Sequence, residues 1–96
     1  MPAAARKWDA CVPHCSTSSM EEGSTTVTIN GLGACRKWDK NNRHQRTGSP
    51  CHEHQGAVAS GSTTVTINGL PAARVGDPLI DCTSISQGSP TVFIGG

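Results

Sequence analysis

Five cysteines and four histidines give this chain of 96 residues an unusual share of side chains that bind transition metals. Three of them follow an aspartate at the same distance of five residues: Asp9 and His14, Asp39 and His44, Asp77 and Cys82. Imidazole nitrogen and thiolate sulfur are the ligands that Zn²⁺ prefers in proteins. The equal offset predicts that one small unit is repeated and that three loops each deliver one ligand to a common zinc site.

A fourth ligand would close a tetrahedral site. The candidates lie together in one segment: Cys51, His52 and His54. We prefer His54, because it lies seven residues before the second copy of the repeat described below, and Cys82 lies six residues before the third copy. His52 is a rival, because it lies nine residues before its copy of the repeat, as His14 does before the first copy.

The same segment has a second interpretation, in which Glu53 is the general base of a catalytic metal site between His52 and His54. A catalytic zinc keeps one position open, however, whereas four protein ligands close it. The chain also contains no His-Glu-x-x-His, no Gly-x-Ser-x-Gly and no phosphate-binding loop. We therefore expect no enzymatic activity, and a small zinc-dependent hydrolase or nuclease that uses segment 51–54 is the alternative.

The elements that must position these ligands are repeats. The sequence Gly-Ser-Thr-Thr-Val-Thr-Ile-Asn-Gly-Leu occurs at 23–32 and, unchanged, at 61–70, and a shorter copy fills 88–96. Alternation in each copy, with Val27 and Ile29 pointing inward in the first, predicts a half-buried strand. The Asn-Gly that follows predicts a tight hairpin of type I′. Units this small must pack against one another to bury their apolar faces.

The segment after each hairpin repeats as well, with an arginine three residues before each aspartate. The pairs are Arg6–Asp9, Arg36–Asp39 and Arg74–Asp77. Because a repeated pair argues for a scaffold rather than for catalysis, we interpret these as structural ion pairs. The chain begins on a returning strand and ends on an outgoing one, so its two ends can pair and complete a third hairpin.

These patterns predict an all-β fold. We expect a single small domain over residues 1–96, with three hairpins in a closed or prism-like pseudo-threefold arrangement and no extension domain. The intervening loops are expected to be irregular and to bring their metal ligands together near the axis: 10–22, 40–60 and 78–87.

Composition excludes several functional classes. A net charge of +1 without a Lys/Arg cluster gives no reason to expect nucleic acid. No apolar run approaches the roughly 18 residues that a membrane-spanning helix needs. No hydrophobic segment precedes the first charges, so we expect no signal peptide and synthesis in the cytoplasm.

The cysteine count is odd, so a complete internal disulfide framework is excluded. The redox states of four cysteines stay open: Cys11, Cys15, Cys35 and Cys51. A secreted, disulfide-stabilised binding module is therefore a third class to consider, although our interpretation requires Cys82 to bind metal. The apolar core is poor, and Trp8 and Trp38 are expected to pack at the loop bases and enlarge it.

The segment Pro71-Ala72-Ala73-Arg74-Val75-Gly76-Asp77, flanked by the repeat copies, resembles the PAAR-repeat proteins. Proteins of that family are cone-shaped tips that cap the trimeric VgrG spike of the bacterial type VI secretion system. The resemblance implies a spike tip that aids membrane puncture and effector delivery, leaves the cell through that system and touches the target membrane transiently. It also implies one structural Zn²⁺ near the apex, which maps here onto His14, His44, His54 and Cys82. The second unit departs from the pattern, with Gly33-Ala34-Cys35-Arg36 in place of Pro-Ala-Ala-Arg.

Overall fold

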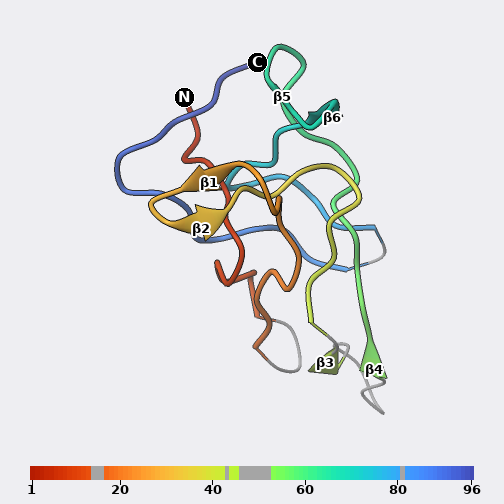
Figure 1. Ribbon diagram of the computed structural model, residues 1–96. Helices are drawn as coiled ribbons and strands as arrows, with labels where there is room; N and C mark the ends of the chain where they lie inside the picture. The colour runs from red at the N-terminus through yellow and green to blue at the C-terminus, as the bar shows by residue number, and fades with distance from the viewer. Residues whose placement is uncertain (14–16, 43, 46–52, 81) are drawn as a thin grey trace.

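The computed structural model describes residues 1–13, 17–42, 44–45, 53–80 and 82–96 (Figure 1). Every regular element within these residues is a β-strand, so the all-β prediction is confirmed for this part of the chain. The described residues include no helix long and apolar enough to cross a membrane. The body is elongated, with principal extents of 39 × 24 × 21 Å.

The two identical repeats form two hairpins of the same geometry. Strand β1 (Thr28–Ile29) pairs with β2 (Leu32–Gly33), and β5 (Thr66–Ile67) pairs with β6 (Leu70–Pro71), both antiparallel. The Asn-Gly loops have positive φ at both residues, with 54° and 79° in the first and 54° and 80° in the second. Positive φ at both central residues is the requirement of a type I′ turn, so the hairpin prediction is confirmed.

The regular strand begins later in each copy than alternation suggests. The hydroxyl of Ser24 accepts hydrogen bonds from the backbone N–H groups of Thr26 (3.1 Å) and Val27 (2.9 Å), which turns the chain before the strand starts. As a result Val27 is 38% exposed while Ile29 is buried. The prediction that both side chains point inward is therefore wrong for Val27, because the alternation holds only beyond this turn.

The two ends of the chain pair, as the sequence predicts. Ala3 forms an antiparallel bridge with Phe93, and the N–H of Ile94 donates to the carbonyl of Pro2 at 2.9 Å. These positions correspond to the paired positions of β1–β2 and β5–β6. The termini accordingly lie close together, at the end of the molecule that carries β1, β2, β5 and β6 (Figure 1).

A closed ring of backbone hydrogen bonds joins the returning segments of the three units. The N–H of Ala5 donates to Ala73, that of Ala73 to Cys35, and that of Cys35 to Ala5, each at 3.0 Å. All three side chains are at most 1% exposed. A small side chain at each position lets the three backbones approach closely enough to bond.

Two small clusters of buried apolar side chains form the core, and the second includes the three residues of this ring. One contains Ala4, Ile29, Ala34, Ile67, Ala72 and Ile94 and packs the hairpins together. The other contains Ala5, Cys11, Met20, Cys35, Val58, Ala73, Leu79 and Ile85 and fills the space beneath the loops. The core is therefore built almost entirely from aliphatic and small side chains.

The segment 40–60 is less irregular than expected. Strands β3 (His44–Gln45) and β4 (Glu53–His54) pair antiparallel, and this hairpin was missed in the sequence. It lies at the end of the molecule opposite the termini (Figure 1). Single bridges also brace the loops at their bases, between Ala10 and Ser19, Lys40 and Ala57, and Pro78 and Ser84.

Candidate functional site

The three Arg–Asp pairs belong to the scaffold, as predicted. The distances from the arginine Nη2 to the aspartate Oδ1 are 2.8 Å for Arg6–Asp9, 3.0 Å for Arg36–Asp39 and 3.1 Å for Arg74–Asp77. In each pair the second carboxylate oxygen also accepts bonds from the arginine backbone N–H and from Nε. The hydrogen bonds to Asp9 raise the pKa of Arg6 above its ordinary value. A carboxylate with all these partners ties a turn together and is not available for chemistry.

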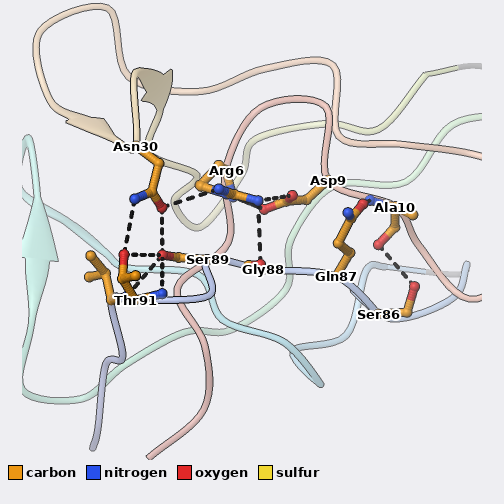
Figure 2. Close-up of polar contacts among 10 residues, drawn as sticks. Arg6, Asp9, Ala10, Asn30, Ser86, Gln87, Gly88, Ser89 and Thr91 are labelled. Carbon is orange, nitrogen blue, oxygen red and sulfur yellow. Dashed lines mark hydrogen bonds and ion pairs between the residues drawn. The ribbon is translucent and has the colours of Figure 1, made fainter.

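Each guanidinium also bonds to a residue at or equivalent to a hairpin turn, and Figure 2 shows this for Arg6. Arg6 Nη1 donates to Asn30 Oδ1 at 3.1 Å, and the same oxygen accepts a bond from the Ser89 hydroxyl. Asn68 plays the same part for Arg36 in the second unit.

The third copy of the repeat has a glycine where the other copies have this asparagine. There the backbone carbonyl of Gly95 accepts from Arg74 Nη1 at 3.2 Å and from the Ser62 hydroxyl at 2.6 Å. A main-chain oxygen thus replaces a side-chain oxygen, and the network is kept.

The loops meet around Asn41, a fully buried side chain that sequence reasoning did not single out. Its Oδ1 accepts from the Gly56 N–H at 2.8 Å, and its Nδ2 lies 3.5 Å from the Ser18 hydroxyl and 3.6 Å from the Cys82 sulfur. One amide therefore touches all three loops. Its signal was available in the sequence, because the equivalent position two residues after the aspartate is apolar in the other units.

Cys82 packs directly against the segment that follows β4. A Cβ added at Gly56 would lie 2.7 Å from the Cβ of Cys82 and 3.3 Å from its sulfur. Gly56 follows His54 by two residues, and the register of β3–β4 sets His44 directly opposite His54. The backbone thus brings His44, His54 and Cys82 to one region of the loop end.

The loop that contains His14 also borders this region. The N–H of Val12 donates to the carbonyl of Ser84 at 2.9 Å, and the Thr83 hydroxyl donates to the carbonyl of Val12 at 2.8 Å. The chain therefore runs beside the residues that follow Cys82 just before it reaches His14.

Of the predicted ligands, only Cys82 has a side chain within the described part of the chain. His14, Cys51 and His52 lie outside it, and of His44, Glu53 and His54 the structure describes the backbone. Among the side chains that the structure describes, no three or more metal-binding groups lie together. Those side chains do not include three of the four predicted ligands: His14, His44 and His54. The zinc site therefore stays a prediction. The backbone positions of His44, His54 and Cys82 and the imidazole and thiol chemistry of the predicted ligands are compatible with a bound Zn²⁺.

The thiols of Cys11 and Cys35 lie in the core, and neither is in a disulfide. Burial raises the pKa of both thiols above the ordinary value, and for Cys35 the rise is large. The Cys35 sulfur lies 3.2 Å from the carbonyl of Glu22, to which the thiol donates. Because a metal binds the thiolate, these two protonated core cysteines behave as small apolar residues.

The two tryptophans do not pack at the loop bases, so that prediction is wrong. Trp8 is 56% exposed and Trp38 is 52% exposed. Both have positive φ, 77° and 79°, and the equivalent third residue, Gly76, has a φ of 93°. The two indoles are therefore more than half exposed and stand at positions where the third unit has a glycine.

Comparison with known proteins identifies the family. The family model of the PAAR motif matches residues 47–96, just over half of the chain. The match includes the Pro-Ala-Ala-Arg segment, the β5–β6 hairpin and the third copy of the repeat. A comparison with curated proteins finds no match.

The chain belongs to the PAAR-motif family. Membership implies a protein that is associated with the spike of a type VI secretion system and is secreted through that system. Proteins of this kind are structural components of the spike tip.

Proposed function

We propose that this chain caps a trimeric VgrG-like spike as its tip, sharpening it for membrane piercing and effector delivery. The closed ring of hydrogen bonds among Ala5, Cys35 and Ala73 carries the proposal, because it repeats one contact in three units of a single chain. A single chain with three equivalent units suits the end of a true trimer. The body that we infer is a pseudo-threefold cone of three hairpins, the third formed by the paired termini.

The face that meets the spike is, in this proposal, the hairpin end. Three valines at the same position of the repeat are exposed there: Val27 at 38%, Val65 at 37% and Val92 at 37%. Three equivalent apolar side chains complement three equivalent chains of a partner. Main-chain groups at the strand ends would add backbone hydrogen bonds, as in β-augmentation.

The stoichiometry of the complex tests this proposal. Purified chain is mixed with a VgrG-like trimer, and the mass of the complex is measured by light scattering. One chain per trimer is expected. Three chains per trimer, or no complex with any such trimer, would contradict the proposal.

A pair of variants locates the binding face. Val65→Glu places a charge at the hairpin end and should weaken the complex at least about tenfold, since a buried unpaired charge is costly. Val12→Glu changes a side chain of similar exposure, 43%, at the loop end and should leave binding unchanged.

We also propose that one structural Zn²⁺ is held by His14, His44, His54 and Cys82. The joining of three loops at Asn41 and the contact of Gly56 with Cys82 support this set. When bound, the metal would cross-link loops that have little hydrophobic core of their own. Four protein ligands leave no open position, so we propose a mechanical role and no catalysis.

Metal analysis tests the ligand set. The purified chain should contain one zinc, and His14→Ala, His44→Ala, His54→Ala and Cys82→Ala should each lower that content and the melting temperature. His52→Ala is the matched control and should keep the metal. If the content stays at one per chain in the His14, His44 and Cys82 variants, the assignment is wrong.

A further inference from the structure

The scaffold places the two tryptophans at positions of positive φ, where a glycine would be free of strain and a bulky side chain is unfavourable. A positive φ is rare for a bulky side chain, and Trp8 and Trp38 both have one. At the equivalent third position, Gly76 adopts the same conformation, and a Cβ added there would meet nothing within 4 Å. Both indoles are nevertheless more than half exposed, and a strained residue whose side chain stays largely at the surface points to a function there.

The local structure presents both indoles in the same way. The N–H of Trp8 donates to Met20, that of Trp38 to Val58, and that of Gly76 to Ile85, at 2.7, 2.9 and 2.8 Å. The ammonium of Lys7 lies 4.9 Å from the centre of the Trp8 ring, and that of Lys37 lies 4.7 Å from the Trp38 ring. The surface therefore carries the same lysine–tryptophan pair twice.

The composition of these pairs distinguishes between kinds of partner. Protein–protein interfaces are enriched in tryptophan but depleted in lysine. The headgroup layer of a membrane uses both, since the indole lies among the glycerol and carbonyl groups while the lysine extends to the phosphates. An anionic lipid surface also attracts lysine electrostatically.

We propose that Lys7–Trp8 and Lys37–Trp38 bind the headgroup layer of a bilayer that contains anionic phospholipid. Binding is shallow and reversible, because two indoles and two ammonium groups are far less than a membrane anchor. The proposal does not depend on the spike or on zinc. Its failure would leave the proposed binding to the spike and to zinc untouched.

Intrinsic fluorescence gives a direct test, because the chain has two tryptophans and no tyrosine. The full chain is titrated with vesicles of phosphatidylcholine alone and of phosphatidylcholine mixed with phosphatidylglycerol. The mixed vesicles should shift the emission to shorter wavelength and bind the chain, and added salt should reverse both effects. Pure phosphatidylcholine should bind much more weakly.

Lysine variants sharpen the test, since they leave both indoles and the backbone in place. Lys7→Gln together with Lys37→Gln should weaken binding to the mixed vesicles by about 30-fold, from the usual contribution of a basic residue near an anionic surface. Lys40→Gln, which removes an exposed charge that stacks on no described ring, is the matched control and should change binding by less than about twofold.

Trp8→Gly and Trp38→Gly leave one indole each as the reporter and place at that position the residue that occupies position 76. Each variant should bind more weakly, and the remaining indole should still shift. Thermal unfolding checks that both variants are folded.

Two outcomes would overturn the proposal. One is the absence of binding to the mixed vesicles, or adsorption without any emission shift, which would mean that the indoles stay in water. The other is an equal loss of binding for Lys40→Gln and for the Lys7–Lys37 double variant.

Discussion

The hairpin end and the loop end of the molecule follow opposite rules. At the hairpin end, equivalent contacts are nearly identical. The second residue of each repeat copy is a serine, and its backbone N–H donates to an alanine carbonyl at 2.8 Å in all three units. At the loop end, equivalent positions differ: two residues after each aspartate stand Cys11, Asn41 and Leu79. Repetition therefore marks the scaffold, and departure from it marks the loop end, where the proposed metal ligands lie.

The largest expected effect is the loss of a buried ion pair. Asp9→Ala removes a carboxylate that is 3% exposed and leaves the Arg6 guanidinium without its partner. Unfolding in denaturant should show a loss of about 3–5 kcal/mol. Asp77→Ala should cost less, because the Asp77 side chain is 11% exposed. An equal loss of unfolding free energy in the two variants would contradict the expectation that a more deeply buried ion pair contributes more to stability.

Two glycine variants test whether the hairpin end and the loop end of the molecule are independent. A Cβ at Gly61 would lie 2.5 Å from the carbonyl oxygen of Ala72, and one at Gly56 would lie 2.7 Å from the Cβ of Cys82. Either alanine variant should therefore lose about 1–3 kcal/mol of stability through overpacking. Only Gly56→Ala should also weaken zinc binding, measured by competition with a chelator. An equal loss of zinc affinity in Gly61→Ala would mean that the ends are not independent.

Two asparagines give a comparison between polar networks. Asn41→Leu introduces the leucine found at the equivalent position 79. The Gly56 N–H then lacks its acceptor, and the free energy of unfolding should fall by about 1–3 kcal/mol. The variant should also hold zinc less tightly, because the amide no longer joins the loops. Asn68→Gly keeps the positive φ of the hairpin turn, 54°, but loses the bonds to Arg36 and Ser24. It should cost about 1 kcal/mol with zinc affinity unchanged, and a lower affinity in this control would argue against the comparison.

The parts of the fold that could be predicted from the sequence are those with local or repeated causes. The Asn-Gly turns, the Arg–Asp pairs and the pairing of the termini all follow from repetition, because equivalent segments form equivalent contacts. The exposure of Val27 could not be predicted, since it depends on a turn made by one serine hydroxyl. The two tryptophans were misjudged because burial was inferred from hydrophobicity, whereas both indoles are more than half exposed, at positions of positive φ.

The candidate site was predictable only in part. His14, His44 and Cys82 could be singled out because each lies five residues after an aspartate of the repeated scaffold. The β3–β4 hairpin and the role of Asn41 belong to the loops, where the three units differ and no internal copy is available for comparison. Asn41 shows that a polar residue at a position that is apolar in the other units can indicate a junction.

The smallest expected effect concerns Cys35, the one place where the scaffold ring departs from alanine. Burial raises the pKa of this thiol above its ordinary value of 9.0, so the folded chain keeps a proton that the unfolded chain releases in alkali. The stability from this group is complete below pH 9 and falls as the pH rises further, by up to about 1.4 kcal/mol per pH unit.

Cys35→Ala introduces the residue found at positions 5 and 73 of the ring. At neutral pH it should cost about 1 kcal/mol, for one buried sulfur and its hydrogen bond, and it should not change zinc content. Above pH 9 its unfolding free energy should fall less steeply than that of the unmodified chain. Some slope should remain, because burial also raises the pKa of Cys11. Parallel curves for the two proteins in alkali would show that the Cys35 thiol is ionised without opening the ring, and that the ring is less tightly closed than its hydrogen bonds indicate.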